Sequence, residues 1–314
     1  MNKFILNQIN RFKVKYSCKE LIEKYLSIGR FFIIYIHDNI IDLRYDSGSD
    51  FLDRKMLIIK LLENTLANHK INDTIIILYY ADGYCNDNTP IFNFALPDGI
   101  LGLIFPHFDI IDIIENTLNN KINSIIKYNP KKIINDFYFK GGANTKKRNT
   151  IRERLEKENF PINVILYSNT HEEQCRMKDH KYLLDLPGVK PQSVRLKYLT
   201  VMERLIIRIS FYDPSRGEKS YWKQVIDYLL TENKDYVHLI YKMNYDIPIN
   251  NNLYKKILFD INKIYEEFEN NDKKYDKMVK NLKKKTEKIN IENIYKYIAK
   301  LINSYTKNII IMDI

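Results

Sequence analysis

The sequence predicts an α/β protein whose sheets contain parallel strands covered by helices. Short apolar runs alternate with helical patterns along most of the chain, as expected when helices connect parallel strands. The chain has 314 residues, too many for one small core and well suited to two domains of moderate size. Hydrophobic residues make up 45% and charged residues 28%, a composition typical of a packed globular protein.

Each predicted strand is a short apolar run bounded by polar or turn-forming residues, the pattern of a strand buried on both faces. In chain order these runs are Phe31–Ile36, Thr74–Tyr80, Ile91–Ala95, Phe137–Phe139, Ile162–Tyr167, Tyr182–Leu186, Leu205–Phe211 and Val237–Ile240.

The predicted helices between them are Arg54–Asn68, Ile110–Ile126, Thr150–Glu158, Val194–Met202 and Tyr221–Leu230. From about Asn251 onward only helical patterns occur. Within Ile291–Leu301 apolar residues recur at spacings of three and four, which predicts a helix with one buried face. The charged, proline-containing segment Asn129–Lys132 is the best candidate for a domain boundary.

The formal net charge of +11 favours anionic partners, although lysine enrichment also arises on ordinary solvated surfaces. The cysteines, Cys18, Cys85 and Cys175, form no CxxC pair, so neither a zinc site nor a disulfide framework is indicated. The N-terminus lacks the apolar core of a signal peptide, and no apolar run is long enough to span a membrane. We therefore expect a cytoplasmic protein without a transmembrane segment.

The first candidate binding segment is FYFKGGANTKKR, in which a strand, a glycine turn and a helix start follow one another. Gly141 and Gly142 would let backbone N–H groups approach a phosphate, and the helix dipole would favour negative charge there. Lys140 and Arg148 add positive charge. A glycine turn near lysines is also common without any ligand.

The second segment, KYLLDLPGVKPQSVRLKYL, has the same organisation. Gly188 follows the strand, Ser193 is a good N-cap, and Arg195 lies in the first helical turn. A cation there opposes the helix dipole unless an anion lies between them. Two such turns at the carboxyl end of one sheet could share a diphosphate.

Asp82 follows the apolar run TIIILYYA, a position that suits a general base at a strand end. An ordinary Asp-Gly turn is the alternative. The histidines show no HExxH or paired spacing, so no metal site is predicted.

Taken together, these motifs resemble glycosyltransferase family 90, the CAP10-like and protein O-glucosyltransferase family. The matching pieces, in order, are ILYYADGY, IFPHF, FYFKGGANTKKR, KYLLDLPGVKPQSVRLKYL, YWKQVIDYL and DYVHL. They extend from about Thr74 to His238, and the spacing from Gly141 to Arg148 equals that of the family motif.

The resemblance implies a GT-B-like fold, with two Rossmann-like domains facing a central cleft and additional C-terminal helices. Residues 1–130 would form the acceptor-side domain, 131–250 the nucleotide-sugar donor domain, and 251–314 a helical segment packing back on the core. The implied activity is an inverting, metal-independent transfer of glucose or xylose from a UDP-sugar to an acceptor hydroxyl on a glycan or protein, with no other cofactor.

The resemblance also assigns roles to individual residues. Asp82 corresponds to the catalytic base, and Pro106 and His107 would face the sugar. The remaining positions would bind the sugar donor: Lys140, Gly141, Gly142, Arg148, Gly188, Val189, Ser193 and Arg195.

The chain departs from the family pattern at Lys140, Gly142 and Ala81, where the family has Arg, Ser and a basic residue. One residue is also inserted between Gly188 and Ser193. These departures leave open a catalytically degenerate GT-B-fold binding protein. The positive charge and the many tyrosines leave open a basic nucleic-acid-binding protein. The second is disfavoured because no basic stripe with interleaved aromatic residues occurs, so nucleic acid is not an expected partner.

Overall fold

The structure is a computed structural model. It describes residues 2–10, 12, 15–26, 29–46, 52–81, 84–85, 89–97, 100, 102–106, 125, 127–140, 146–158, 160–165, 175–187, 195–214, 218–219, 224–243 and 248–312. The chain forms two compact units. Unit 1 comprises Met1–Ile114, Lys223–Tyr228 and Ile289–Ile314, and unit 2 comprises Glu115–Trp222 and Leu229–Lys288. Unit 1 is discontinuous in sequence because the last helix returns to it.

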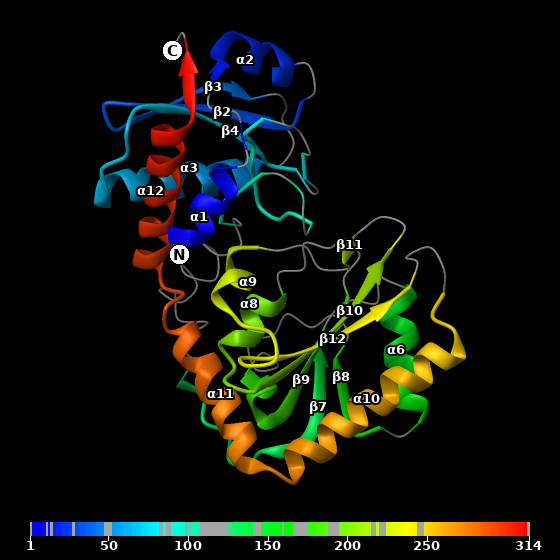
Figure 1. The fold of residues 1–314 in the computed structure, drawn as a ribbon. Coiled ribbons are helices and arrows are strands. Elements are labelled where there is room, and N and C mark those ends of the chain that lie inside the picture. Colours follow the sequence, from blue (N-terminus) through cyan, green and yellow to red (C-terminus); the bar gives the residue numbers. More distant parts are fainter. Residues whose placement is uncertain are drawn as a thin grey trace. The chain divides into compact units, whose positions relative to one another are not determined.

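Unit 1 contains a mixed sheet with the strand order β3-β2-β4-β5-β6 (Figure 1). Its strands are β2 (Phe31–His37), β3 (Ile40–Asp46), β4 (Thr74–Tyr79), β5 (Phe92–Asn93) and β6 (Leu103–Ile104). A separate parallel pair joins β1 (Lys15–Ser17) to β13 (Ile310–Met312). The helices that accompany these strands are α1 (Asn2–Ile9), α2 (Cys18–Leu26), α3 (Leu52–Asn68) and α12 (Ile291–Asn308).

The expectation of parallel strands holds for only part of unit 1. Strands β4, β5 and β6 are parallel, whereas β2 runs antiparallel to both β3 and β4. The cause is the two-residue turn Asp38-Asn39, in which both residues have positive φ (50° and 60°). That conformation matches the twist of a β-hairpin, and Asp and Asn tolerate it better than most residues. It joins β2 directly to β3 without a crossover helix.

The apolar pattern of α12 explains its place in unit 1. Its buried residues recur at helical spacing and share one core with the β2 and β4 strands: Ile294, Tyr297, Ile298, Leu301, Ile302 and Tyr305. Asn290 caps its start by accepting a hydrogen bond from the Asn293 N–H. The helix is longer than the predicted Ile291–Leu301.

Unit 2 contains a second sheet with the strand order β11-β10-β9-β7-β8, and β12 pairs with β10. All of its pairs are parallel except that of β10 with the short β11. The strands are β7 (Ile134–Lys140), β8 (Ile162–Ile165), β9 (His180–Asp185), β10 (Leu205–Asp213), β11 (Glu218–Lys219) and β12 (Val237–Lys242).

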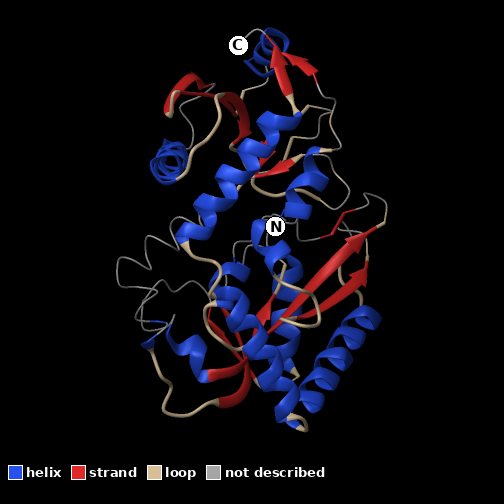
Figure 2. Cartoon of the chain, turned by 60° about the vertical axis from the view of Figure 1, so that its left-hand side comes forward, coloured by secondary structure: helices blue, strands red, loops and turns tan. Residues whose placement is uncertain are grey.

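Long helices lie over one face of this sheet (Figures 1 and 2). Residues of α6, α10 and α11 share a core with side chains from β7, β9, β10 and β12. The helices of this part of the chain are α6 (Lys146–Lys157), the 3-10 turn η1 (Met177–Asp179), α8 (Arg195–Thr200), α9 (Val225–Leu229, largely in unit 1), α10 (Asn251–Glu269) and α11 (Asp272–Thr286).

Every predicted strand overlaps an observed one, which confirms the α/β class. The predicted helix Ile110–Ile126 falls largely outside the described residues, and the other predicted helices overlap observed ones. The start predicted for the helix Thr150–Glu158 is wrong, because α6 begins at Lys146. Within the described ranges, no helix combines the length and the apolar character that crossing a bilayer would require.

Candidate functional site

The candidate site lies at the carboxyl end of the sheet in unit 2. Strands β7 and β9 are direct neighbours and parallel, so both end at the same edge. Strand β7 ends at Lys140 and is followed by α6, and β9 ends at Asp185 and is followed by α8. The chain passes through β8 between them, yet β8 pairs on the far side of β7. The strands of the two predicted binding segments therefore end side by side.

The structure describes some of the predicted site residues and not others. Lys140 is half-buried, and its ammonium nitrogen is shielded from solvent. Arg148 is the third residue of α6 and Arg195 the first of α8; the description of both is limited to the backbone. Pro106 is buried after β6 in unit 1. The remaining predicted residues lie outside the described ones: Asp82, His107, Gly141, Gly142, Gly188, Val189 and Ser193.

Both helices at this edge begin without an acidic residue in the first turn. Helix α6 begins with Lys146, Lys147 and Arg148, and α8 begins with Arg195. Basic residues at a helix N-terminus oppose the positive end of the dipole by some tenths of a kcal/mol each. The mismatch at the start of each helix is relieved if an anion binds between its basic side chains and the helix end.

A row of polar and charged side chains crosses the sheet at the level where β7 and β9 end. Asp185 on β9 is paired in register with Arg208 on β10, which in turn is paired with His238 on β12. The pairing of β7 with β9 aligns Tyr138 with Leu183. Two residues further along each strand, Lys140 therefore lies level with Asp185. Because cross-strand partners share a face, these side chains lie on the face opposite the apolar core formed with α6, α10 and α11.

Asp185 and Arg208 form a buried ion pair. The Arg208 Nε donates to Asp185 Oδ2 at 2.8 Å, and the side chains are 4% and 0% exposed. The guanidinium also lies 5.7 Å from the centre of the Tyr236 ring. Sequence reasoning missed this pair. The available signal was an arginine inside the apolar strand LIIRISF, since a buried charge requires a partner.

A second buried polar group joins β10 to β12. The Ser210 hydroxyl lies 2.5 Å from His238 Nε2, and His238 Nδ1 lies 3.0 Å from a Glu232 carboxylate oxygen. The order serine, histidine, acid is that of a nucleophilic triad. However, Ser210 is 0% exposed and lies within β10, where its hydroxyl cannot reach a substrate. We therefore assign this group a structural role in fixing β12 against β10.

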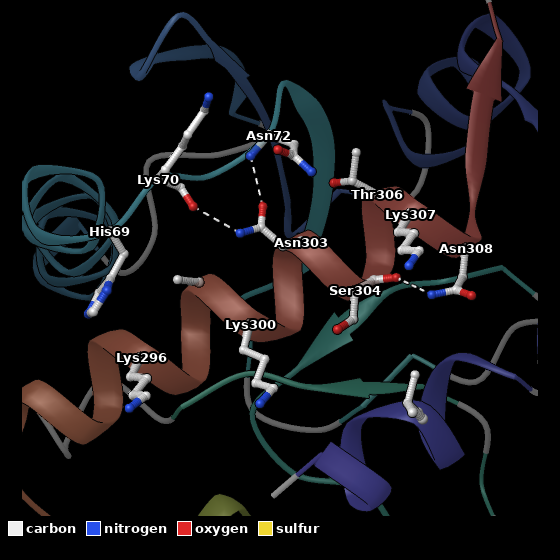
Figure 3. Close-up of a pocket in the computed structure, with 12 residues that line it drawn as sticks. His69, Lys70, Asn72, Lys296, Lys300, Asn303, Ser304, Thr306, Lys307 and Asn308 are labelled. Carbon is white, nitrogen blue, oxygen red and sulfur yellow. Dashed lines mark hydrogen bonds between the residues drawn. The ribbon is translucent and has the colours of Figure 1, made fainter.

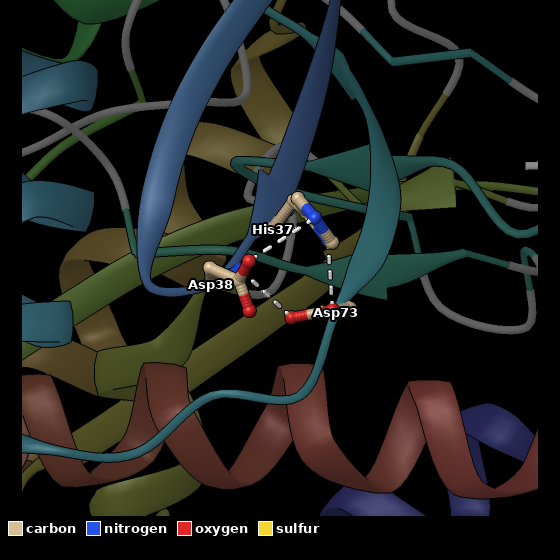
Figure 4. Close-up of side chains that lie close together, drawn as sticks. All are labelled: His37, Asp38 and Asp73. Atoms are coloured by element: carbon tan, nitrogen blue, oxygen red, sulfur yellow. Dashed lines mark hydrogen bonds and ion pairs between the residues drawn. The ribbon is translucent and has the colours of Figure 1, made fainter.

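A group of possible metal ligands lies elsewhere, at the β2–β3 turn of unit 1 (Figure 4). Potential ligand atoms of His37, Asp38 and Asp73 lie within 4.8 Å of one another. Both ring nitrogens of His37 already face carboxylates, at 2.9 Å from Asp73 and 3.2 Å from Asp38. All three side chains are exposed, and we assign the group no role in binding. The sequence did not predict it because Asp73 is distant along the chain.

An open groove of about 790 Å³ runs beside α12 in unit 1 (Figure 3). Asn303 borders it and joins α12 to the segment between α3 and β4, accepting from the Asn72 N–H at 2.8 Å and donating to the Lys70 carbonyl at 2.9 Å. Lysines and amides line the groove. Among the predicted site residues that the structure describes, none lines the groove.

A comparison of the sequence with models of protein families finds no matching family, and a comparison with curated proteins finds no match.

Proposed function

We propose that the chain is a glycosyltransferase and that the carboxyl edge of β7 and β9 binds the diphosphate of a UDP-sugar. The observation that carries this proposal is the direct, parallel pairing of β7 with β9. It brings the ends of two strands to one edge, where ligands bind in open α/β sheets, and a helix with a basic start follows each strand in sequence. The likeness to family 90 noted from the sequence supports the same assignment.

The charge at this edge suits a diphosphate. The nitrogen of Lys140 is shielded from solvent, so water screens its field less than that of a surface lysine. A bound diphosphate would also relieve the conflict between the basic first turns of α6 and α8 and their helix dipoles. The sugar donor would thus be held by backbone N–H groups and cations in place of a metal ion.

The proposed reaction is a single displacement with inversion. An acceptor hydroxyl oxygen on a glycan or protein attacks the anomeric carbon of glucose or xylose while the bond to the diphosphate oxygen breaks. The hydroxyl proton passes to Asp82, acting as general base. Lys140, Arg148 and Arg195 stabilise the charge that grows on the departing UDP. In this proposal units 1 and 2 are the two Rossmann-like domains of a GT-B-like fold.

Binding of the sugar donor is tested by calorimetry and thermal shift with UDP, UDP-glucose and UDP-xylose. We expect Lys140→Gln and Arg195→Ala each to weaken UDP binding by about tenfold or more, equivalent to about 1.4 kcal/mol. Lys157→Gln, at the opposite, exposed end of α6, is the matched control and should bind as the wild type does. No saturable UDP binding by the wild-type chain would refute the proposal.

Catalysis is tested separately by following transfer and donor hydrolysis for the wild type and Asp82→Asn. Loss of turnover with UDP affinity retained is the expected result. If Asp82→Asn turns over like the wild type, the assignment of the base is wrong. Tight UDP binding with no turnover toward any acceptor would identify a binding protein. Steeply salt-dependent nucleic-acid binding without UDP binding would favour the nucleic-acid alternative.

A further inference from the structure

Helix α11 carries a stripe of lysines on the side opposite its buried residues. Tyr275, Met278 and Leu282 face the interior at spacings of three and four. The exposed lysines on the other side are Lys273, Lys277, Lys280 and Lys284. Their spacings of four, three and four keep them on one line along the helix. At 1.5 Å per residue, the stripe is about 16 Å long.

The stripe keeps a net positive charge, although the exposed Asp276 lies beside it on α11, three residues from Lys273 and four from Lys280. Lysines on the flanks of α11 do form ion pairs: Lys274 with Glu267, and Lys283 with Glu203 at 3.0 Å. Asp272, at the start of the helix, lies 3.7 Å from the Lys181 nitrogen. For the four stripe lysines, no ion pair occurs with any residue in the described part of the chain. Their positive charges therefore face solvent together.

Helix α10 adds an exposed aromatic residue to the same side of unit 2. Phe259 is 66% exposed, and Lys255, Lys256 and Lys263 are exposed within about one turn of it. Residues of α10 and of the first half of α11 belong to one core against the same face of the sheet. The outward sides of these two helices therefore lie over that face, away from the strands.

We propose that this outer surface of α10 and α11 binds the anionic surface of a lipid membrane. Lysine ammonium groups in one straight row can all approach a flat layer of negatively charged headgroups, and a helix with this many lysines is typical of such binding. Phe259 can enter the boundary between headgroups and acyl chains. The inference does not depend on the proposed sugar transfer.

A single-stranded nucleic acid fits this surface less well. Strand binding usually combines a basic groove with several aromatic side chains on which successive bases stack. On α10 and α11, Phe259 is the one exposed aromatic side chain, because Tyr254, Phe268 and Tyr275 are buried and Tyr265 is half-buried.

The test is co-sedimentation of the full chain with phosphatidylcholine vesicles, with and without one third phosphatidylserine. We expect binding only to the anionic vesicles and its loss at high salt. One lysine near such a surface contributes about 1 kcal/mol, or about fivefold in partition. If at least two stripe lysines reach the vesicle surface together, removing all four should weaken binding to anionic vesicles roughly twentyfold or more. The variant is Lys273→Gln/Lys277→Gln/Lys280→Gln/Lys284→Gln.

The matched control is Lys70→Gln/Lys296→Gln/Lys300→Gln/Lys307→Gln, which removes the same charge from the groove beside α12 (Figure 3). It should retain most of the binding. Equal losses in the two variants would show that net charge alone is responsible and would overturn the proposal. So would equal binding to neutral vesicles, or tighter binding to single-stranded RNA than to anionic vesicles at the same salt. Unchanged UDP affinity in the stripe variant would separate this result from the proposed function.

Discussion

Removing Arg208 should destabilise unit 2 strongly because it leaves the Asp185 carboxylate buried without its ion-pair partner. The two charged atoms are 2.8 Å apart, and Asp185 is 0% exposed. With an effective dielectric constant of about 20, Coulomb's law gives a gross attraction of about 6 kcal/mol at this distance. Much of that is offset by desolvation of both groups, but losing one partner of a buried pair typically costs about 3–5 kcal/mol. We expect a loss of that size for Arg208→Met and for Asp185→Leu.

The double variant distinguishes a coupled pair from two independent residues. If both charges are removed and replaced by apolar side chains, no buried charge is left, so Arg208→Met/Asp185→Leu should unfold within about 1–2 kcal/mol of the wild type. Urea unfolding followed by far-UV circular dichroism measures all four proteins, with the exposed Lys157→Met as a control for loss of a cation. If the double variant loses the sum of the two single losses, the residues are not coupled and the reasoning fails.

Other predictions concern single contacts. Burial alone would raise the pKa of Glu269, but hydrogen bonds from Lys181 and its neighbour Tyr182, with the charge of Lys181, outweigh it and lower the pKa. The stability that the ionised Glu269 contributes is fully present above its unfolded pKa of about 4.3 and is lost as pH falls through its folded pKa. Glu269→Gln should therefore lower the free energy of unfolding by about 1–3 kcal/mol at neutral pH, and by progressively less below about pH 4, as measured by urea titration. A stability difference between the wild type and Glu269→Gln that does not shrink in acid would contradict this. Tyr297→Phe removes a 2.6 Å hydrogen bond to the buried Ile104 carbonyl, so it should lower the free energy of unfolding by about 1–3 kcal/mol, measured by thermal unfolding. If the variant is as stable as the wild type, the carbonyl has found another donor. Gly102→Ala would place a Cβ 2.7 Å from the Leu96 Cδ1 methyl in the core, so it should lower the free energy of unfolding by about 1–3 kcal/mol in the same assay. If no stability is lost, the surrounding core rearranges without strain.

Much of the secondary structure follows from the sequence because the strands and the last helix have clear apolar patterns. Runs such as TIIILY are buried on nearly every residue, and a buried strand of this kind leaves an unbroken apolar stretch. The strands without a predicted counterpart are β1, β3, β6, β11 and β13. Strand β3 lies at the edge of its sheet and exposes Ile40 and Leu43, so its sequence, IIDLRYD, lacks a clear pattern.

The candidate site was predictable only in its local pieces. A strand followed by a basic helix start can be recognised around Lys140 and Arg195 from the letters alone. The proximity of the two turns cannot be recognised in this way, because strand β8 lies between them in sequence and local sequence does not specify which strand β8 pairs with. Had β8 paired between β7 and β9, the two turns would be separated by an additional strand spacing of about 4.8 Å.

The α/β class, most of the strands, most helix positions and the basic residues after β7 and β9 follow from the amino-acid sequence alone. The tertiary structure decided which of these elements are neighbours. It paired β7 with β9, aligned Asp185 with Arg208 and returned α12 to unit 1. The physical reason is that hydrophobic periodicity and capping act over a few residues, whereas strand order and ion pairing depend on contacts between segments distant in the chain.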